Sequence, residues 1–170
     1  MIIIARIGGT VDSIAWLRCV SCRQGVVINR GTQSPGTLPF DDPASTPEKD
    51  LAAWQEVRNC LSVGANTAAV MMCRKLLFHI AVSHGLEETN AKGRAPSFAE
   101  ALDHLQDEGI ITKHMLTWVN RIKSVGNEAN HELNGVDSDQ ANDIAKFTRQ
   151  LMYLAFELPA MVPATDSQAP

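Results

Sequence analysis

Apolar positions recur at helical spacing from residue 46 nearly to the end of the chain. Phe98, Ala101, Leu102 and Leu105 follow the i, i+3, i+4, i+7 pattern of a helix with one buried face, and similar stripes precede and follow them. Proline and short polar residues come before several stripes, and glycine comes after several, as expected at helix ends. The pattern predicts five helices, which begin near residues 47, 66, 97, 112 and 138.

The second predicted helix, from about Asn66 to His84, is apolar on nearly every side. A helix of this kind is usually buried, so we expect it to be the central helix, with Gly85 as its C-cap. The last helix is expected to end at Pro159 and Pro163, since proline removes a helix hydrogen bond.

The first 46 residues have a different pattern. Residues 2–7 and 25–28 are short runs rich in β-branched residues and are predicted to be strands. Glycine, proline, serine and threonine then predict an extended linker. We expect a β/turn segment (1–30), a linker (31–46), a helical bundle (47–160) and a flexible tail (161–170). The predicted fold class is all-α, a bundle of about five helices.

Composition agrees with a helical bundle. Only 5% of the residues are aromatic, so aliphatic side chains must fill the core, which favours helix packing over a β-sandwich. The net charge of −4 gives no general attraction to nucleic acid.

The sequence contains no convincing targeting or membrane segment. The opening Met-Ile-Ile-Ile is too short for the apolar region of a signal peptide. The most hydrophobic stretch, residues 65–82, contains Arg74 and Lys75, which would be costly in a bilayer. We therefore expect a cytoplasmic protein with reduced cysteines.

The fourth helix is predicted to have a distinct polar strip. With about 100° per residue and Trp118 as the reference, Ile122, Val125 and Ala129 lie on the buried side. The opposite side contains Asn120, Lys123, Asn127 and His131. The simplest interpretation is a solvated face. However, Gly126 costs about 1 kcal/mol in a helix relative to alanine, and a close dimer contact would explain it.

This segment resembles a known superfamily. Gly126-Asn127-x-x-x-His131-Glu132, between an apolar helix and an acid-opened final helix, resembles the HEPN superfamily. Within that superfamily it resembles a bacterial domain-of-unknown-function family often found alone or fused to restriction and other defence proteins. Residues 63–75 and Phe98-Ala99-Glu100-Ala101-Leu102 support the resemblance, which covers about residues 50–160.

The resemblance implies a bundle that dimerises through the fourth helix. In active HEPN ribonucleases an arginine, a polar residue and a histidine cut RNA without metal. His131 matches the catalytic histidine and Asn127 the polar position, but Gly126 stands at the arginine position. Lys123, one turn earlier, could supply a weaker cation, since lysine lacks the bidentate fork of arginine.

A second motif lies in the first segment. Cys19-Val-Ser-Cys22 between short strands is similar to one knuckle of a zinc ribbon. A closed zinc site needs four ligands, so two would have to come from elsewhere. Cys60 and Cys73 lie on predicted helices with apolar spacing and are expected to be buried hydrophobic side chains.

Two main functions remain open from the sequence. One is a non-catalytic, homodimeric HEPN-like module that recognises RNA or a protein in bacterial defence or stress response. The other is a metal-independent, toxin-like endoribonuclease that uses His131, Asn127 and Lys123. A weaker third interpretation is a zinc-linked adaptor built on Cys19 and Cys22.

Overall fold

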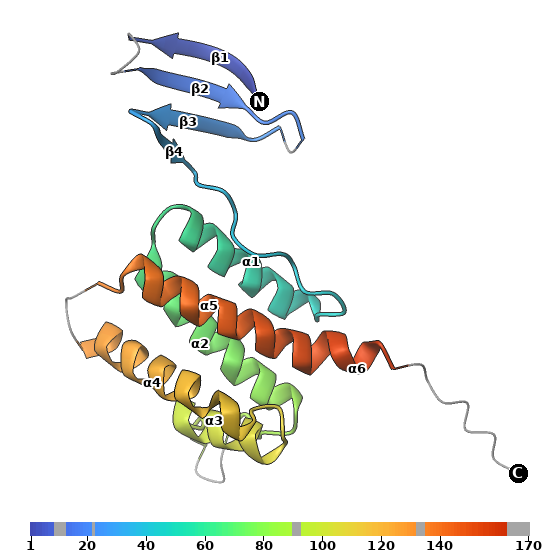
Figure 1. Ribbon diagram of the computed structural model, residues 1–170. Helices are drawn as coiled ribbons and strands as arrows, with labels where there is room; N and C mark the ends of the chain where they lie inside the picture. Colours follow the sequence, from blue (N-terminus) through green and yellow to red (C-terminus); the bar gives the residue numbers. More distant parts are fainter. Residues whose placement is uncertain (9–12, 22, 90–92, 132–134, 163–170) are drawn as a thin grey trace, which may run out of the picture.

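The chain forms a bundle of helices with a small β-sheet at one end (Figure 1). The computed structural model describes residues 1–8, 13–21, 23–89, 93–131 and 135–162, and for residues 126–131 it describes the backbone only. The four strands are β1 (Ile2–Ile7), β2 (Ile14–Arg18), β3 (Gly25–Asn29) and β4 (Thr32–Ser34). They pair in the antiparallel order β1-β2-β3-β4.

The all-α prediction is therefore wrong, and the fold is a mixed one with both helices and a sheet. The strands expected at residues 2–7 and 25–28 are confirmed, but β2 and β4 were not expected. β4 occupies the first residues of the predicted linker. β2 could not be predicted because it is only five residues long and has no clear strand pattern of its own. It forms a strand because it pairs with β1 on one side and β3 on the other.

One strand of the sheet is exposed along its whole length. β1 is an edge strand and lies farthest from the helices (Figure 1). Its four isoleucines have exposed fractions of 55–64%. By contrast, Leu17 of β2 and Val26 of β3 are cross-strand partners and are both buried. The sheet thus buries a small apolar contact near its centre and leaves one edge open.

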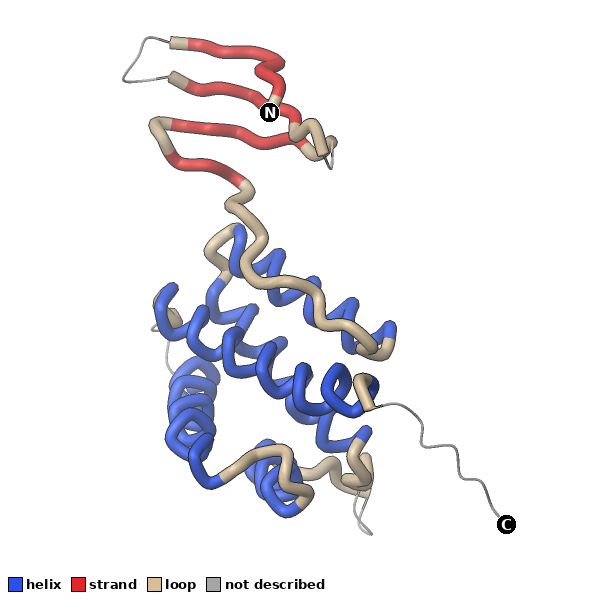
Figure 2. The backbone as a smooth tube through the Cα atoms, turned by 45° about the vertical axis from the view of Figure 1, so that its right-hand side comes forward, coloured by secondary structure: helices blue, strands red, loops and turns tan. Residues whose placement is uncertain are grey.

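A strap joins the sheet to the bundle and follows α1 (Glu48–Ser62), as Figure 2 shows. The Gly36 backbone N–H donates to the Ser62 carbonyl at 2.7 Å, and a Cβ at Gly36 would lie at the same distance from that oxygen. Only glycine allows this approach. Further along, the Trp54 indole N–H donates to the Asp41 carbonyl at 2.9 Å. The strap, residues 35–47, is therefore fixed to α1 by hydrogen bonds near its start and at its middle.

The bundle is arranged around α2 (Asn66–Ser83), which contacts every other long helix. α1 lies on one side of α2, while α3 (Phe98–Asp107) and α4 (Leu116–His131) lie on the other, and α5 (Ser138–Met152) lies alongside (Figure 1). Seven residues of α2 are buried, which confirms it as the central helix. An exposed strip that includes Met71, Lys75 and His79 nevertheless remains.

The helix ends follow the capping signals closely. Ser97 and Glu100 form a capping box at the start of α3, and Asp137 and Gln140 form one at α5. Gly64, Gly85 and Gly109 have positive φ angles just after α1, α2 and α3. α4 is preceded by a 3₁₀ turn at Lys113–Met115.

The last helix passes the proline that was expected to end it. α5 continues through a π-helical turn (Tyr153–Glu157) into α6 (Leu158–Ala160), and Pro159 lies in the first turn of α6. Proline is tolerated in the first turn of a helix, because a backbone N–H there would have no acceptor within that helix. Pro163 lies outside the described residues. No helix in the described ranges is both long and apolar enough to cross a membrane.

The contrast between core and edge isoleucines gives a first prediction. Ile122→Ala, at a site with no exposed surface, should lower the free energy of unfolding by about 2–5 kcal/mol because it leaves a cavity. Ile4→Ala, at a site that is 64% exposed, should change it by less than about 0.5 kcal/mol. Urea unfolding of both variants measures the difference. An equal loss in Ile4→Ala would mean that β1 is covered in solution.

The strap gives a second prediction, on pH. The Arg149 guanidinium donates to both oxygens of the Asp41 carboxylate, at 3.2 and 2.8 Å, and these hydrogen bonds hold the pKa of Asp41 below its usual value. A carboxylate with a lowered pKa stabilises the fold above its ordinary pKa, and this contribution is lost as the pH falls through the lowered value.

Asp41→Asn should therefore reduce the free energy of unfolding at neutral pH, and the difference from the wild type should shrink as the pH drops below about 4. The side chain of Asp41 is 76% exposed, so solvent screening limits the effect to about 0.2–1 kcal/mol. Denaturant unfolding across this pH range is the measurement. A difference that grows on acidification would contradict the assigned pairing.

Candidate functional site

The candidate site lies on α4, which is held at the edge of the bundle. Val119, Ile122 and Val125 are buried, with exposed fractions of 4%, 0% and 5%. Asn120 and Arg121 are exposed. α4 thus packs against the bundle through one face and presents the other face to solvent.

The expected orientation of α4 is partly wrong. The predicted buried stripe is centred near Trp118, but this side chain is 37% exposed. On a helical projection the three buried residues are centred about 40° from Trp118, on the side of Val119. Ile122 and Val125 are inward, as expected. The error arises because the stripe is broad and a large aromatic residue was assumed to lie at its centre.

Two cations on α4 lie on opposite flanks of the helix and each meets an acid. Lys123 Nζ lies 3.9 Å from Asp103 Oδ1 of α3, and Arg121 Nη2 lies 3.0 Å from Asp143 Oδ2 of α5. Lys123 was expected to share a solvated strip with Asn127 and His131. Its ammonium group is directed toward α3, and its side chain is 32% exposed.

The remaining residues of the expected strip cannot be placed beside Lys123. The backbones of Asn127 and His131 are part of α4, but their side chains are outside the described part of the structure. The same is true of the contacts around Gly126. The catalytic arrangement of His131, Asn127 and Lys123 stays a prediction.

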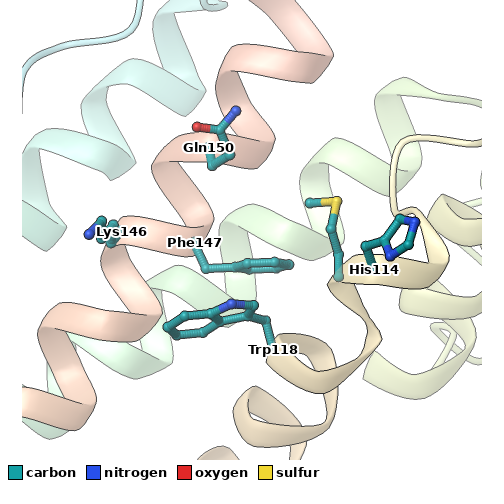
Figure 3. A pocket seen from close by; sticks show the side chains of 6 residues that line it. His114, Trp118, Lys146, Phe147 and Gln150 are labelled. Atoms are coloured by element: carbon teal, nitrogen blue, oxygen red, sulfur yellow. The ribbon is translucent and has the colours of Figure 1, made fainter.

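A shelf of two stacked aromatic rings lies between α4 and α5, and we call Trp118 and Phe147 the aromatic shelf. Their ring centroids are 6.2 Å apart and their planes differ by 17°. Figure 3 shows the indole lying flat against Phe147, with His114 on one side and Lys146 on the other. The shelf borders an open hollow of about 320 Å³, which Met115 and Gln150 also line. Sequence reasoning missed this feature because it placed Trp118 in the core.

A histidine–carboxylate pair joins α1 and α2. His79 Nδ1 lies 3.5 Å from Asp50 Oδ1, and the two side chains are 50% and 10% exposed. The nearly buried Asp50 lies in the first turn of α1, where a negative charge is also favourable to the helix dipole.

The cysteines separate into two groups. Cys19 lies in the turn between β2 and β3, where its N–H donates to the Gln24 carbonyl at 3.0 Å, while Cys22 lies outside the described residues. Cys73 is buried, as expected, and burial raises the pKa of its thiol to about 12. Cys60 is only partly buried and packs against the core.

The zinc site expected at Cys19 and Cys22 stays a prediction, because Cys22 lies outside the described residues. Among the side chains that the structure describes, no three or more His, Cys, Asp or Glu converge as a metal would require. Cys73 is a poor ligand because a thiol must ionise to bind zinc, and burial opposes this. The described residues therefore supply too few ligands for the closed site that Cys19 and Cys22 would need.

These features define a helical bundle with an N-terminal antiparallel sheet and an exposed aromatic shelf. A family model described as a domain of unknown function (DUF4145) matches residues 55–166, which is more than half of the chain. The chain therefore belongs to this family. No curated protein and no solved structure matches the chain.

Proposed function

We propose that the chain is a non-catalytic, HEPN-like interaction module that pairs with a second copy through α4 and recognises RNA or a protein partner in bacterial defence or stress response. The observation that carries the proposal is the one-sided packing of α4. Its described buried side chains, Val119, Ile122 and Val125, lie on one face, whereas Asn120 on the opposite face is exposed. The defence setting rests on the sequence resemblance alone.

Two further features support a binding role over a catalytic one. Gly126 stands where the resemblance requires the catalytic arginine, so a strong bidentate cation is missing at that position. Lys123, the candidate replacement, is directed toward Asp103. A helix that keeps the motif histidine without its arginine fits a surface retained for recognition.

Pairing through α4 predicts a specific effect of charge. In a two-fold symmetric dimer, a new arginine on the shared face occurs twice and repels its counterpart. Asn120→Arg should weaken self-association at least about tenfold, while Asn59→Arg, at an exposed asparagine of α1, should leave it unchanged. Sedimentation equilibrium measures both. A wild-type chain that stays monomeric at about 100 µM, a concentration that saturates a micromolar dimer, would refute pairing.

Endoribonuclease activity is the second candidate function. The weak ion pair of Lys123 with Asp103 is compatible with a role of this lysine in binding phosphate. The contact with Asp103 is 3.9 Å long and the Asp103 side chain is 72% exposed. Such exposed pairs are weak, so the ammonium group is free to turn toward a phosphate. His131 would then act as general base and Lys123 would stabilise the charge of the transition state.

This candidate predicts metal-independent cleavage with a defined residue dependence. With a chelator present, the wild type should cut a structured RNA pool and leave 2′,3′-cyclic phosphate ends. Activity should fall at least about 100-fold in His131→Ala and in Lys123→Ala, and should persist in Lys113→Ala, a nearby exposed lysine. Cleavage that persists in His131→Ala would rule out the assigned residues, and no cleavage by the wild type would leave the binding role.

A further inference from the structure

The aromatic shelf is unusual because a large indole is left partly open in a chain with few aromatic residues. Trp118 is 37% exposed, although it stacks on Phe147, which is itself only 6% exposed, and the Arg121 guanidinium lies over its ring at 5.9 Å from the centroid. Tryptophan is enriched at interfaces, because its ring supplies a large apolar contact area and its N–H a polar contact. The shelf therefore offers a flat apolar surface to a ligand.

The charges beside the shelf indicate the sign of that ligand. The hollow is lined by Lys146 and His114 and by no acidic residue within the described part of the chain. Neither side chain has a hydrogen bond or ion pair to another described residue, in contrast to Arg121 and Lys123, which both meet acids. A negatively charged group beside the rings would thus find the ammonium group of Lys146 without an acidic partner among the described residues.

We propose that the aromatic shelf binds a base of single-stranded nucleic acid, with Trp118 as the stacking surface and Lys146 contacting the adjacent phosphate. A flat ring that bears a phosphate is the ligand chemistry that matches a stacked indole with cations at its border. The hollow of about 320 Å³ is at the small end of ligand sites, which suits one nucleotide. The exposed Gln150 amide is available to the base edge.

The site is distinct from the side of α4 that carries Lys123. Trp118 lies on the α5 side of the helix, and Lys123 lies on the α3 side. Binding at the shelf therefore does not require the pairing of two copies or the motif histidine. Since every base has a stacking face and no described group reads the 2′-hydroxyl, RNA and DNA single strands should both bind, with little sequence preference.

The test measures fluorescence anisotropy of a labelled 12-nucleotide single strand with the full-length chain at low salt. Trp118→Ala should weaken binding at least about tenfold, because one stacked base is lost. The matched control is Trp16→Ala, which removes an equally exposed indole (38%) from the sheet and should change affinity less than about twofold. A probe of the same length with abasic sites should bind the wild type as weakly as the normal probe binds Trp118→Ala.

Lys146→Gln tests the phosphate contact separately from stacking. Because Lys146 is exposed, this substitution should leave the fold intact. Loss of one phosphate contact should reduce the slope of log affinity against log salt by about 0.7, whereas Trp118→Ala should leave the slope unchanged. Equal binding by Trp118→Ala and Trp16→Ala, equal binding of the abasic probe, or no binding at low salt would each overturn the proposal.

Self-association of the same variants is measured without oligonucleotide. If Trp118→Ala changes the dimer equilibrium and not oligonucleotide binding, the shelf is a contact between copies and the nucleic-acid site is refuted. Because Asn120→Arg leaves the shelf untouched, failure of α4 pairing and failure of the shelf site are distinguishable.

Discussion

The burial of α2 is the constraint on which the rest of the structure depends. Its apolar residues cannot be left in water, and full burial of each large aliphatic side chain contributes about 1.5–3 kcal/mol. α1, α3, α4 and α5 all contact it, and their buried residues form one continuous cluster with those of α2. The capping boxes and the positive-φ glycines end the helices where this packing requires the chain to turn.

The burial of α2 also explains why much of the surface of α4 stays exposed to solvent. α2 is already covered mainly by α1, α3 and α5, so α4 adds a narrower contact through Val119, Ile122 and Val125. A narrow buried stripe leaves the flanking positions 118, 121 and 123 at the border of the core. Arg121 and Lys123 each meet an acid on a neighbouring helix, whereas Trp118 stacks on Phe147, lies under the Arg121 guanidinium and stays 37% exposed.

The helices could be predicted from sequence because their signals are local. Helical periodicity, proline, glycine and capping residues act within a few positions, so the starts of α2, α3 and α5 were predicted within a residue or two. The sheet could not be predicted in full, because β2 and β4 are defined by partners and not by their own residues. The direction of α4 was misjudged for a related reason. Periodicity relates positions to one another, but neighbouring helices determine which of them is most buried.

The net charge of −4 does not describe the local charge at each part of the surface, because packing decides which charged side chains meet. Charge acts on a ligand through its local arrangement, and acids already offset several of the basic side chains: Asp41 meets Arg149, Asp103 meets Lys123 and Asp143 meets Arg121. Each pair lowers the local positive charge that an approaching anionic ligand meets. Lys146 and His114 are left beside an open aromatic surface without such a partner among the described residues. An acidic chain can therefore present a site for an anionic, aromatic ligand, and the packing of α4 against α5 is what creates it.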